Sequence, residues 1–352
     1  MPKILIDHHH QALRYSLQLL FEKRLGWEVY TQIGMEWWDE KLWSVFPARD
    51  TAQQFLGLDH AINHPKDVHG QPVPQSAVLN AKYEDLGDGV YMVNDPVVGI
   101  PYAAITFEKF KTTKFDVLLC SMPQHIEIWK RLQRDYQPQA KLIFQIGNSW
   151  AIPGDIKNVL ASCAPVAVPA GVNAAFYRQE FDLDTYKYEP PTGTKKIHSF
   201  IHYMRGKHFM NKLQELLPEW QCRSFGAGME DSIRKAEDVA ASMRGADFGF
   251  IFKPEGDGMG HSVHGLFACG RPPIVWGSHY RGKLGGQLME HNRTCIDVEK
   301  MGSMEAVAAR LQEIASTDEH AQMCKAAADR FREIVNYDRE EKEIRKFLDR
   351  LI

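Results

Sequence analysis

Short apolar runs and helical apolar stripes alternate along most of the chain. Residues 3–7 and 27–33 are strand-like runs, and Leu13, Leu17 and Leu20 recur between them at the spacing of one helix face. A strand, a helix and a strand in this order predict a βαβ unit. The alternation returns at 115–121 (strand), 124–135 (helix), 141–146 (strand) and 165–169 (short strand). Elements of this length predict a parallel sheet with helices on both faces.

A second series of the same kind begins after a charged, proline-rich stretch. Residues 177–196 show no apolar period, which is typical of a linker. Beyond them, strands are expected over 196–203, 221–225, 247–252 and 273–276, helices over 210–217, 236–244 and 262–268, and two more helices near the end. We therefore expect two doubly wound α/β domains facing each other across a cleft. The expected divisions are an N-terminal domain (1–176), a linker (177–196), a C-terminal domain (197–335) and a final helix (336–352).

Residues 35–100 interrupt the first series. This stretch contains Trp37, Trp38 and Trp43, several Pro and Gly residues, and a polar run over 64–75. We expect an insertion that lies over the first domain. The tryptophans could stack on a sugar or on an exposed base, and packing within the core is the alternative.

Composition narrows the class of protein. A chain of 352 residues is more than one core usually holds. Lys and Arg total 42 against 45 Asp and Glu, so any nucleic acid must be held by a local patch. Six cysteines without a CxxC pair favour a reducing cytosol over a zinc ribbon or a disulfide framework. No signal peptide or membrane-spanning run is expected, and we predict a cytoplasmic protein.

The most informative stretch is 252–276, FKPEGDGMGHSVHGLFACGRPPIVW. A strand leads into a glycine-rich loop, and a helix is expected to start near His261 or Ser262. Glycines let the backbone approach a ligand, and the first free N–H groups of a helix attract an anion such as a diphosphate. On the glycines alone, an ordinary strand–helix connection is the alternative.

At this point the chain resembles glycosyltransferases of the GT-B architecture, in particular the family-4-like group. Glu255-Gly256-Asp257-Gly258 is similar to that group's Glu-Gly-x-Gly, and 268–272 (ACGRP) to its Ala-Cys-Gly-x-Pro. Residues 169–173 (PAGVN), followed by Phe176, resemble the signature at the domain junction. The strand 196–203 with the basic loop after it resembles the opening of the donor domain. The resemblance covers about residues 165–352.

The resemblance implies a glycosyltransferase that moves a hexosyl or pentosyl group. The second domain would hold a nucleoside-diphosphate sugar, with UDP as the expected nucleotide, as co-substrate and without a metal or other cofactor. Cations aimed at the diphosphate would stabilise the leaving group, and a solvated basic turn is the alternative. The expected donor-binding residues are Arg205, Lys207, Glu255, Gly256, Gly258, Gly260, His261, Ser262 and His264.

Two features depart from the family pattern. The position of the second family Glu, which holds the donor ribose, is Gly265, and the loop after Gly258 is two residues longer. The resemblance then implies that ribose contacts come from Glu255, His261 or His264 instead.

The catalytic candidates follow the first strand. In inverting GT-B enzymes this loop supplies a His general base, sometimes oriented by an Asp, and here it contains Asp7, His8, His9 and His10. Neighbouring side chains point in alternating directions, so chelation of a metal by all three histidines is not expected. For at least two of the three histidines we expect a structural or hydrogen-bonding role. On the acceptor side we expect Asn148, Trp150, Trp37 and Trp38, with interdomain packing as the alternative for Trp150.

The acceptor is the least defined part. Compact size, the tryptophan-rich insertion and local basic segments resemble phage-type glycosyltransferases that modify hydroxymethylated bases in DNA, which would act in the host cytoplasm. One such segment, 109–114 (KFKTTK), is expected to form a surface strand. A glycan or small-molecule acceptor, a nucleotide-sugar epimerase and a catalytically silent nucleotide-binding regulator are the alternatives.

Overall fold

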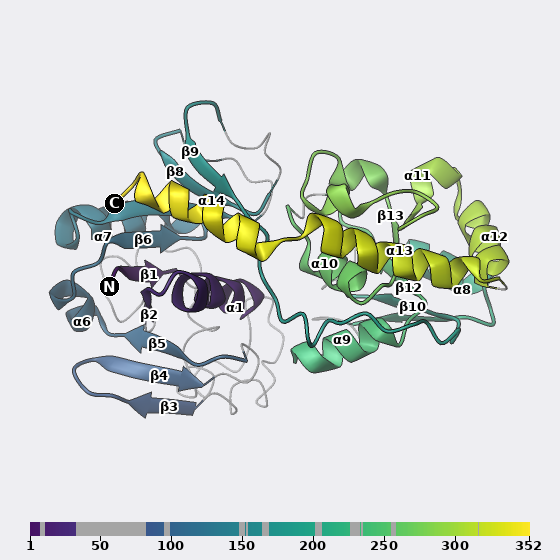
Figure 1. Cartoon of the computed structure of the whole chain (residues 1–352), viewed down its shortest axis with the longest axis horizontal. Coiled ribbons are helices and arrows are strands. Elements are labelled where there is room, and N and C mark those ends of the chain that lie inside the picture. Colours follow the sequence, from purple (N-terminus) through teal and green to yellow (C-terminus); the bar gives the residue numbers. More distant parts are fainter. Residues whose placement is uncertain are drawn as a thin grey trace.

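The structure is a computed structural model that describes residues 1–7, 11–32, 82–94, 99–147, 152, 154–163, 169–200, 206–225, 233, 235–254, 258–315 and 317–352. Two α/β units lie side by side along the long axis of the molecule, each built around its own sheet (Figure 1). We call the unit around the first sheet the first domain and the unit around the second sheet the second domain.

The first sheet has nine strands among the described residues, in the order β3-β4-β5-β2-β1-β6-β7-β8-β9. All neighbours are parallel except β3–β4 and β4–β5, which form an antiparallel edge. The strands are β1 (Lys3–Ile6), β2 (Glu28–Gln32), β3 (Lys82–Asp85), β4 (Val90–Asn94), β5 (Tyr102–Ile105), β6 (Val117–Cys120), β7 (Lys141–Ile146), β8 (Asn158–Ala161) and β9 (Asn173–Phe176). The helices are α1 (Gln11–Gln18), which continues as the π-helix η1 (Leu19–Arg24), α6 (Phe107–Thr112), the 3-10 turn η3 (Pro123–His125) and α7 (Ile126–Tyr136).

Alternating side chains of the central strands build two apolar layers. Ile4 and Ile6 of β1 pack with Leu17 of α1, whereas Leu5 packs with Trp129 of α7 on the opposite face. Successive side chains of a strand point to opposite faces, so a strand buried on both sides is apolar throughout. This is why β1 and β6 are continuous apolar runs in the sequence.

The second sheet has five described strands, all parallel, in the order β11-β10-β12-β13-β14. They are β10 (Lys196–Ser199), β11 (Gln221–Ser224), β12 (Phe248–Ile251), β13 (Pro273–Val275) and β14 (Ile296–Asp297). The helical elements are α8 (Lys207–Leu216), α9 (Ala236–Arg244), α10 (His261–Ala268), η5 (Gly277–Tyr280), η6 (Gly285–Leu288), α11 (Val298–Met301), α12 (Met304–Ala315) and α13 (Glu319–Ile334). Residues 177–195, between the two sheets, contain no helix or strand.

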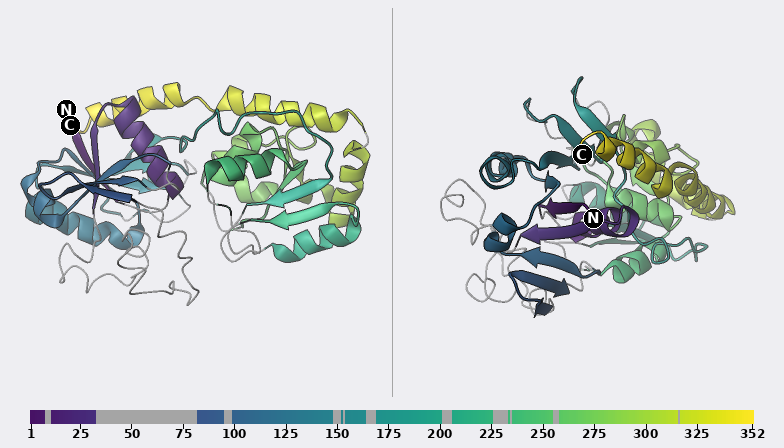
Figure 2. Two further views of the ribbon diagram at one scale, coloured as in Figure 1. Left: turned by 90° about the horizontal axis from the view of Figure 1, so that it is seen from below. Right: turned by 60° about the vertical axis from the view of Figure 1, so that its left-hand side comes forward.

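The last helix returns to the first domain. Beyond α13, α14 (Tyr337–Asp349) runs across to the first sheet, and the two helices form one continuous path over both domains (Figure 2). Ile344, Phe347 and Leu348 are buried in the same apolar layer as α1. Where the helix crosses, Glu340 forms a buried ion pair with Arg178.

The structure confirms the predicted fold class and corrects one local prediction. Both sheets are predominantly or wholly parallel and covered by helices, as the alternating pattern indicated. The predicted surface strand over 109–114 is wrong, because residues 107–112 form helix α6. The Thr106 side chain accepts a hydrogen bond from Lys109 N and so starts this helix, and Phe110 is fully buried. Most of the predicted insertion and of the predicted strand at 165–169 lies outside the described residues.

Candidate functional site

The strand order places a topological switch point in each sheet. In the first sheet β1 lies between β2 and β6, and in the second sheet β10 lies between β11 and β12. From β1 the chain goes first to β2 on one side and later to β6 on the other, and from β10 it goes first to β11 and later to β12. Ligands bind at the carboxyl ends of the strands at such points. The segments after β1, β6, β10 and β12 therefore define the candidate site.

Two helices begin at the switch point of the second sheet. Helix α8 follows β10 with Gly206 as its N-cap, and helix α10 follows β12 with Gly260 as its N-cap at φ +77°. Neither N-cap uses a side chain to bond the first amides of its helix. The amides of a helix's first turn and the positive end of its dipole favour an anion at this place.

Close contacts hold the two helix starts together. A Cβ on Gly206 would lie 2.6 Å from the Cβ of Phe252, so only glycine fits where the β10–α8 turn crosses the end of β12. The Ser262 hydroxyl donates to the main-chain oxygen of Phe200, at 3.1 Å, and joins α10 to the end of β10. Lys207, the first residue of α8, is exposed. Of the predicted donor-binding residues, Lys207, Ser262 and the glycines at 258 and 260 are thus brought to one switch point.

The two histidines of α10 have different surroundings. His261, the first residue of the helix, is half-buried and contacts the side-chain oxygen of Gln179 through Nε2. His264 is fully buried, its Nδ1 bonds the main-chain oxygen of Gly260 at 3.2 Å, and burial lowers its pKa to about 3. His264 is therefore a buried, neutral ring that bonds the N-cap residue of its own helix.

The glycine-rich loop rests on the first domain. Gly258 donates its N–H to the oxygen of Gly147 at 3.2 Å, just beyond β7. A Cβ on Gly258 would lie 2.4 Å from the oxygen of Ser162 and 2.5 Å from the Cα of Cys163. The loop that resembles a donor-binding motif is therefore also an interdomain contact.

Asp7 lies at the switch point of the first sheet and is buried. Its Oδ2 accepts from Ser121 N at 3.1 Å and contacts His125 Nδ1 at 2.8 Å, and its Oδ1 accepts from Gln32 Nε2 at 3.3 Å. The side chains of Asp7 and His125 are both fully shielded from solvent. Asp7 thus joins the ends of β1, β2 and β6, and among the described residues the histidine that it orients is His125.

Several predicted site residues lie outside the described residues: His8, His9, His10, Trp37, Trp38, Asn148, Trp150, Arg205, Glu255 and Gly256. Sequence reasoning missed His125 and Gln179. Each follows the end of a strand closely, His125 after β6 and Gln179 after β9. The rule that ligands gather at strand ends would have drawn attention to both.

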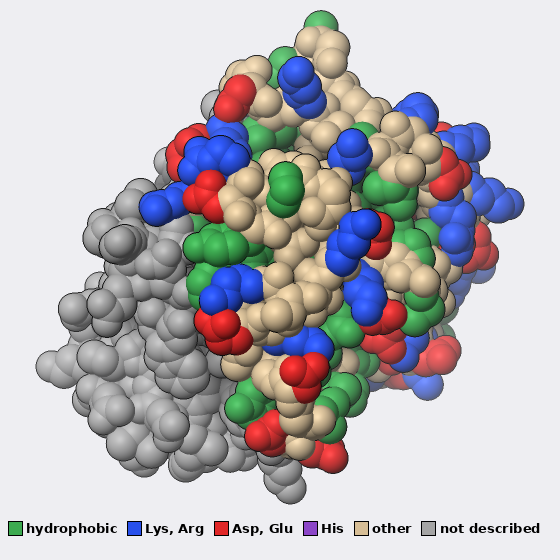
Figure 3. All heavy atoms as spheres, turned by 90° about the vertical axis from the view of Figure 1, so that its left-hand side faces the viewer, with side chains coloured by type: hydrophobic (Ala, Val, Ile, Leu, Met, Phe, Trp, Pro, Cys, Tyr) green, Lys and Arg blue, Asp and Glu red, His purple; other side chains and the backbone are tan. Residues whose placement is uncertain are grey.

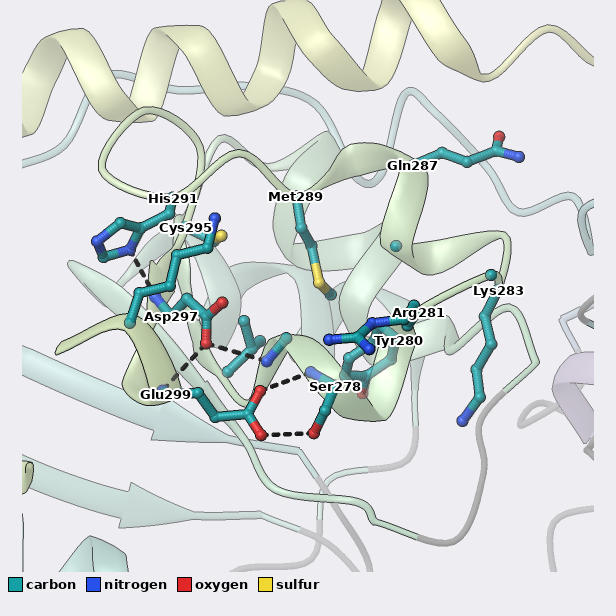
Figure 4. Close-up of a pocket in the computed structure, with 15 residues that line it drawn as sticks. Ser278, Tyr280, Arg281, Lys283, Gln287, Met289, His291, Cys295, Asp297 and Glu299 are labelled. Atoms are coloured by element: carbon teal, nitrogen blue, oxygen red, sulfur yellow. Dashed lines mark hydrogen bonds between the residues drawn. The ribbon is translucent and has the colours of Figure 1, made fainter. Parts of the chain in front are cut away.

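A cavity of about 620 Å³ opens beside the switch point, at the carboxyl ends of β13 and β14 (Figure 4). Glu299 accepts from the amide and the hydroxyl of Ser278, at 2.7 and 2.6 Å, and Asp297 accepts from Gly277 N at 3.1 Å. The side chains of Arg281 and Lys283 also line it. None of the predicted site residues lies here.

Within the described residues, no three His, Cys, Asp or Glu side chains gather closely enough to hold a metal ion. No helix in the same part of the chain is both long and apolar enough to cross a bilayer.

Comparison with known proteins identifies the architecture. No protein-family profile matches the chain, and no curated protein sequence does. Solved structures match over its whole length. Anabaena Alr3699/HepE in complex with UDP-glucose has a TM-score of 0.60 and 12% identity, over 99% of this chain and 100% of that one. A glycosyltransferase from Rickettsia africae has a TM-score of 0.60 and 12% identity, over 99% and 98%.

A third match is an α-glucosyltransferase in complex with UDP and a 13-mer DNA containing a HMU base. Its TM-score is 0.56 and its identity 10%, over 99% of both chains. The fold shared with these proteins is GT-B, and the architecture predicted from the sequence is confirmed. This chain has the GT-B fold.

Proposed function

We propose that the protein is a glycosyltransferase that moves a sugar from a UDP-linked donor to a hydroxyl acceptor. The observation that supports this best is the meeting of two uncapped helix starts, α8 and α10, at the β10–β12 switch point. Glycines bring the backbone close at both starts. An anionic diphosphate is the ligand that such a place favours.

The donor-side residues then take distinct roles. Arg205 and Lys207 hold the diphosphate together with the amides between Gly258 and Ser262, and Glu255 contacts the donor sugar or the ribose. Cations and amides stabilise the negative charge that develops on the diphosphate leaving group, so the reaction needs no metal ion. If the reaction inverts the anomeric centre, a histidine of the 8–10 loop is the general base.

We propose a hydroxymethylated base in duplex DNA as the acceptor. The α-glucosyltransferase that has this fold and was solved with UDP and DNA supports this choice. Figure 3 shows the end of the first domain that faces away from the second domain, where Lys and Arg side chains are interspersed with Asp and Glu. With a net charge of −3, DNA contacts must be local and must bring the base, flipped or in the groove, to the interdomain side.

The cytoplasm is the proposed location, a host cytoplasm if a phage encodes the protein. The six cysteines support it, because all are free and five are buried.

Donor binding is tested by calorimetry with UDP. The double variant Arg205→Ala, Lys207→Ala loses charge-assisted hydrogen bonds to the diphosphate, and we expect the Kd to rise about 100-fold. The control Lys325→Ala, Arg332→Ala removes two exposed cations from α13 and leaves the Kd unchanged. Equal affinity in the first variant and the wild type would remove both residues from the site.

Transfer is tested with UDP-glucose and two DNA duplexes, one containing hydroxymethyluracil and one unmodified, followed by mass spectrometry of the nucleosides. We expect a hexose on the hydroxymethylated base alone, and duplex binding that weakens steeply with salt. Labelling of neither duplex by a protein that binds UDP would contradict the DNA acceptor and favour a glycan or small molecule. Conversion of the donor without any acceptor would instead identify an epimerase.

A further inference from the structure

A buried chain of hydrogen bonds runs from the first sheet to the start of α10. Gln145 of β7 donates through Nε2 to the Tyr177 hydroxyl, at 3.1 Å, and to the Ser162 hydroxyl, at 3.3 Å. Gln179 donates through its own Nε2 to the same Ser162 oxygen, at 2.8 Å. The Gln179 Oε1 meets Nε2 of His261. Gln145, Ser162 and Gln179 are at most 4% exposed, so no water competes for these groups.

The partners fix the direction of each bond. The Ser162 hydroxyl donates to the oxygen of Ile146, at 3.4 Å, so its lone pairs accept from the two glutamine amides. The amide nitrogen of Gln179 is thus committed to Ser162, which leaves its oxygen as an acceptor toward His261. An acceptor at that position requires a proton on Nε2 of the imidazole ring.

Two further contacts of the same loop reinforce this junction. The main-chain N–H of Gln179 donates to the sulfur of Met259, with 2.8 Å between nitrogen and sulfur. The main-chain N–H of Gly258 donates to the oxygen of Gly147. The crossing segment, the end of β8 and the glycine-rich loop therefore meet at Gln179.

We propose that Gln179 is a positioning residue that holds His261 as the Nε2–H tautomer and couples the start of α10 to the first domain. Its kinetic consequence rests on the proposed glycosyltransferase function, whereas the tautomer does not. Donor bound at α8 and α10 is then presented to the acceptor side in one orientation. Any separation of the two domains breaks the Gln179–Ser162 or the Gln179–His261 bond.

The structural part is tested by ¹⁵N NMR of protein labelled at histidine, with His261 assigned from a His261→Gln variant. In the wild type, at a pH where the His261 ring is neutral, Nε2 should carry the proton and Nδ1 should not. Gln179→Met has nearly the same length but no hydrogen-bonding group, and should give shifts averaged between the two tautomers. Gln179→Glu keeps an acceptor toward His261 and should restore the proton on Nε2, although it loses the amide that donates to Ser162 and its carboxylate also favours a proton on Nδ1. A wild-type spectrum for Gln179→Met would overturn the proposal.

A matched control is Gln287→Met. Gln287 also lies at the interdomain crossing, and its side-chain oxygen accepts from Arg178 rather than from a histidine. This variant should leave the His261 signals unchanged. Circular dichroism checks that each variant is folded, and Gln179→Asn, too short to span Ser162 and His261, repeats the test if Gln179→Met does not fold.

The kinetic part uses transfer to the acceptor. Gln179→Met should lower kcat by about 10- to 100-fold, since a small misplacement of a substrate costs this much. The Kd of UDP, which binds within the second domain, should stay within about twofold, and Gln179→Glu should recover part of kcat. Unchanged kcat together with an altered tautomer would refute the coupling. Absence of UDP binding in the wild type would instead refute the proposed function and leave the NMR result standing.

Discussion

Arg14 is a positively charged side chain that is buried without a hydrogen-bond acceptor among the described residues. The residue lies on α1, is 1% exposed, and all three guanidinium nitrogens lack a hydrogen-bond partner in the part of the chain that the structure describes. The ring of Tyr102 lies 4.4 Å from the guanidinium carbon, and the charge of Glu22 is also favourable. Burial lowers the pKa of Arg14 to about 10. A buried cation without an acceptor opposes folding, and the stacking offsets only part of that cost.

Replacement of Arg14 by Met should therefore stabilise the protein. Met keeps an apolar side chain of similar length and removes the unpaired charge, and we expect the free energy of unfolding to rise by about 1 kcal/mol. Urea denaturation measures this change. Arg134→Met, at an exposed arginine paired with Asp135, serves as control and should leave the free energy of unfolding close to that of the wild type. A clearly less stable Arg14→Met protein would mean that the guanidinium has a stabilising role.

For single residues, the sequence indicates which side chains carry reactive groups, but it does not indicate which other side chains they contact. The pattern identified Asp7 as the residue that ends the first strand, and the structure places it at the switch point. Its bond to His125 joins residues 118 positions apart, and only the fold brings β1 and β6 side by side. A single sequence holds no signal for such a pairing.

Among elements, the helices and strands of the second domain were predicted best. The helix predicted over 236–244 matches α9 in full, and the strand predicted over 141–146 in the first domain matches β7. Long apolar runs and amphipathic periods depend only on neighbouring residues, and for this reason they predict the elements of the folded chain. The antiparallel edge β3-β4-β5 and helix α6 were missed, although β4 and β5 are apolar runs, because runs of four to six residues do not distinguish strand from helix or show which strands pair.

The glycine-rich loop gives a prediction for an element. Alanine at Gly258 would place a Cβ against the main chain of Ser162 and Cys163. The loop must move away, and we expect Gly258→Ala to lose about 1–3 kcal/mol of stability together with the bond to Gly147. Gly154→Ala is the control, because nothing lies within 4 Å of its added Cβ. Equal urea midpoints for the two variants would show that the loop does not press on the first domain.

For the whole molecule, the crossing of α14 holds the two domains in one arrangement. Arg178 donates to Glu340 through its main-chain N–H, at 2.6 Å, and through its side chain, and also donates to Gln287 of the second domain. Burial raises the pKa of Glu340, although hydrogen bonds and charge from Arg178 oppose this. Arg178 and Glu340 are therefore two buried charges, and each is stabilised by the other.

Glu340→Ala should destabilise the protein by about 3–5 kcal/mol, because it leaves Arg178 buried without its carboxylate. Glu343→Ala on the same helix removes an exposed partner of Lys346 and should leave the stability close to that of the wild type. Thermal unfolding followed by circular dichroism compares the two variants. Similar losses in both would show that the crossing does not depend on the buried pair.

The return of α14 also sets the order in which the protein can be completed on the ribosome. Ile344, Phe347 and Leu348 belong to the apolar layer that α1 begins, yet they are synthesised after the whole of the second domain. The second domain ends at α13 and can fold earlier, whereas the first domain waits with one apolar face open to solvent. The first domain is therefore completed only after the second, and a nascent chain that stops before residue 337 leaves that face available to chaperones or to aggregation.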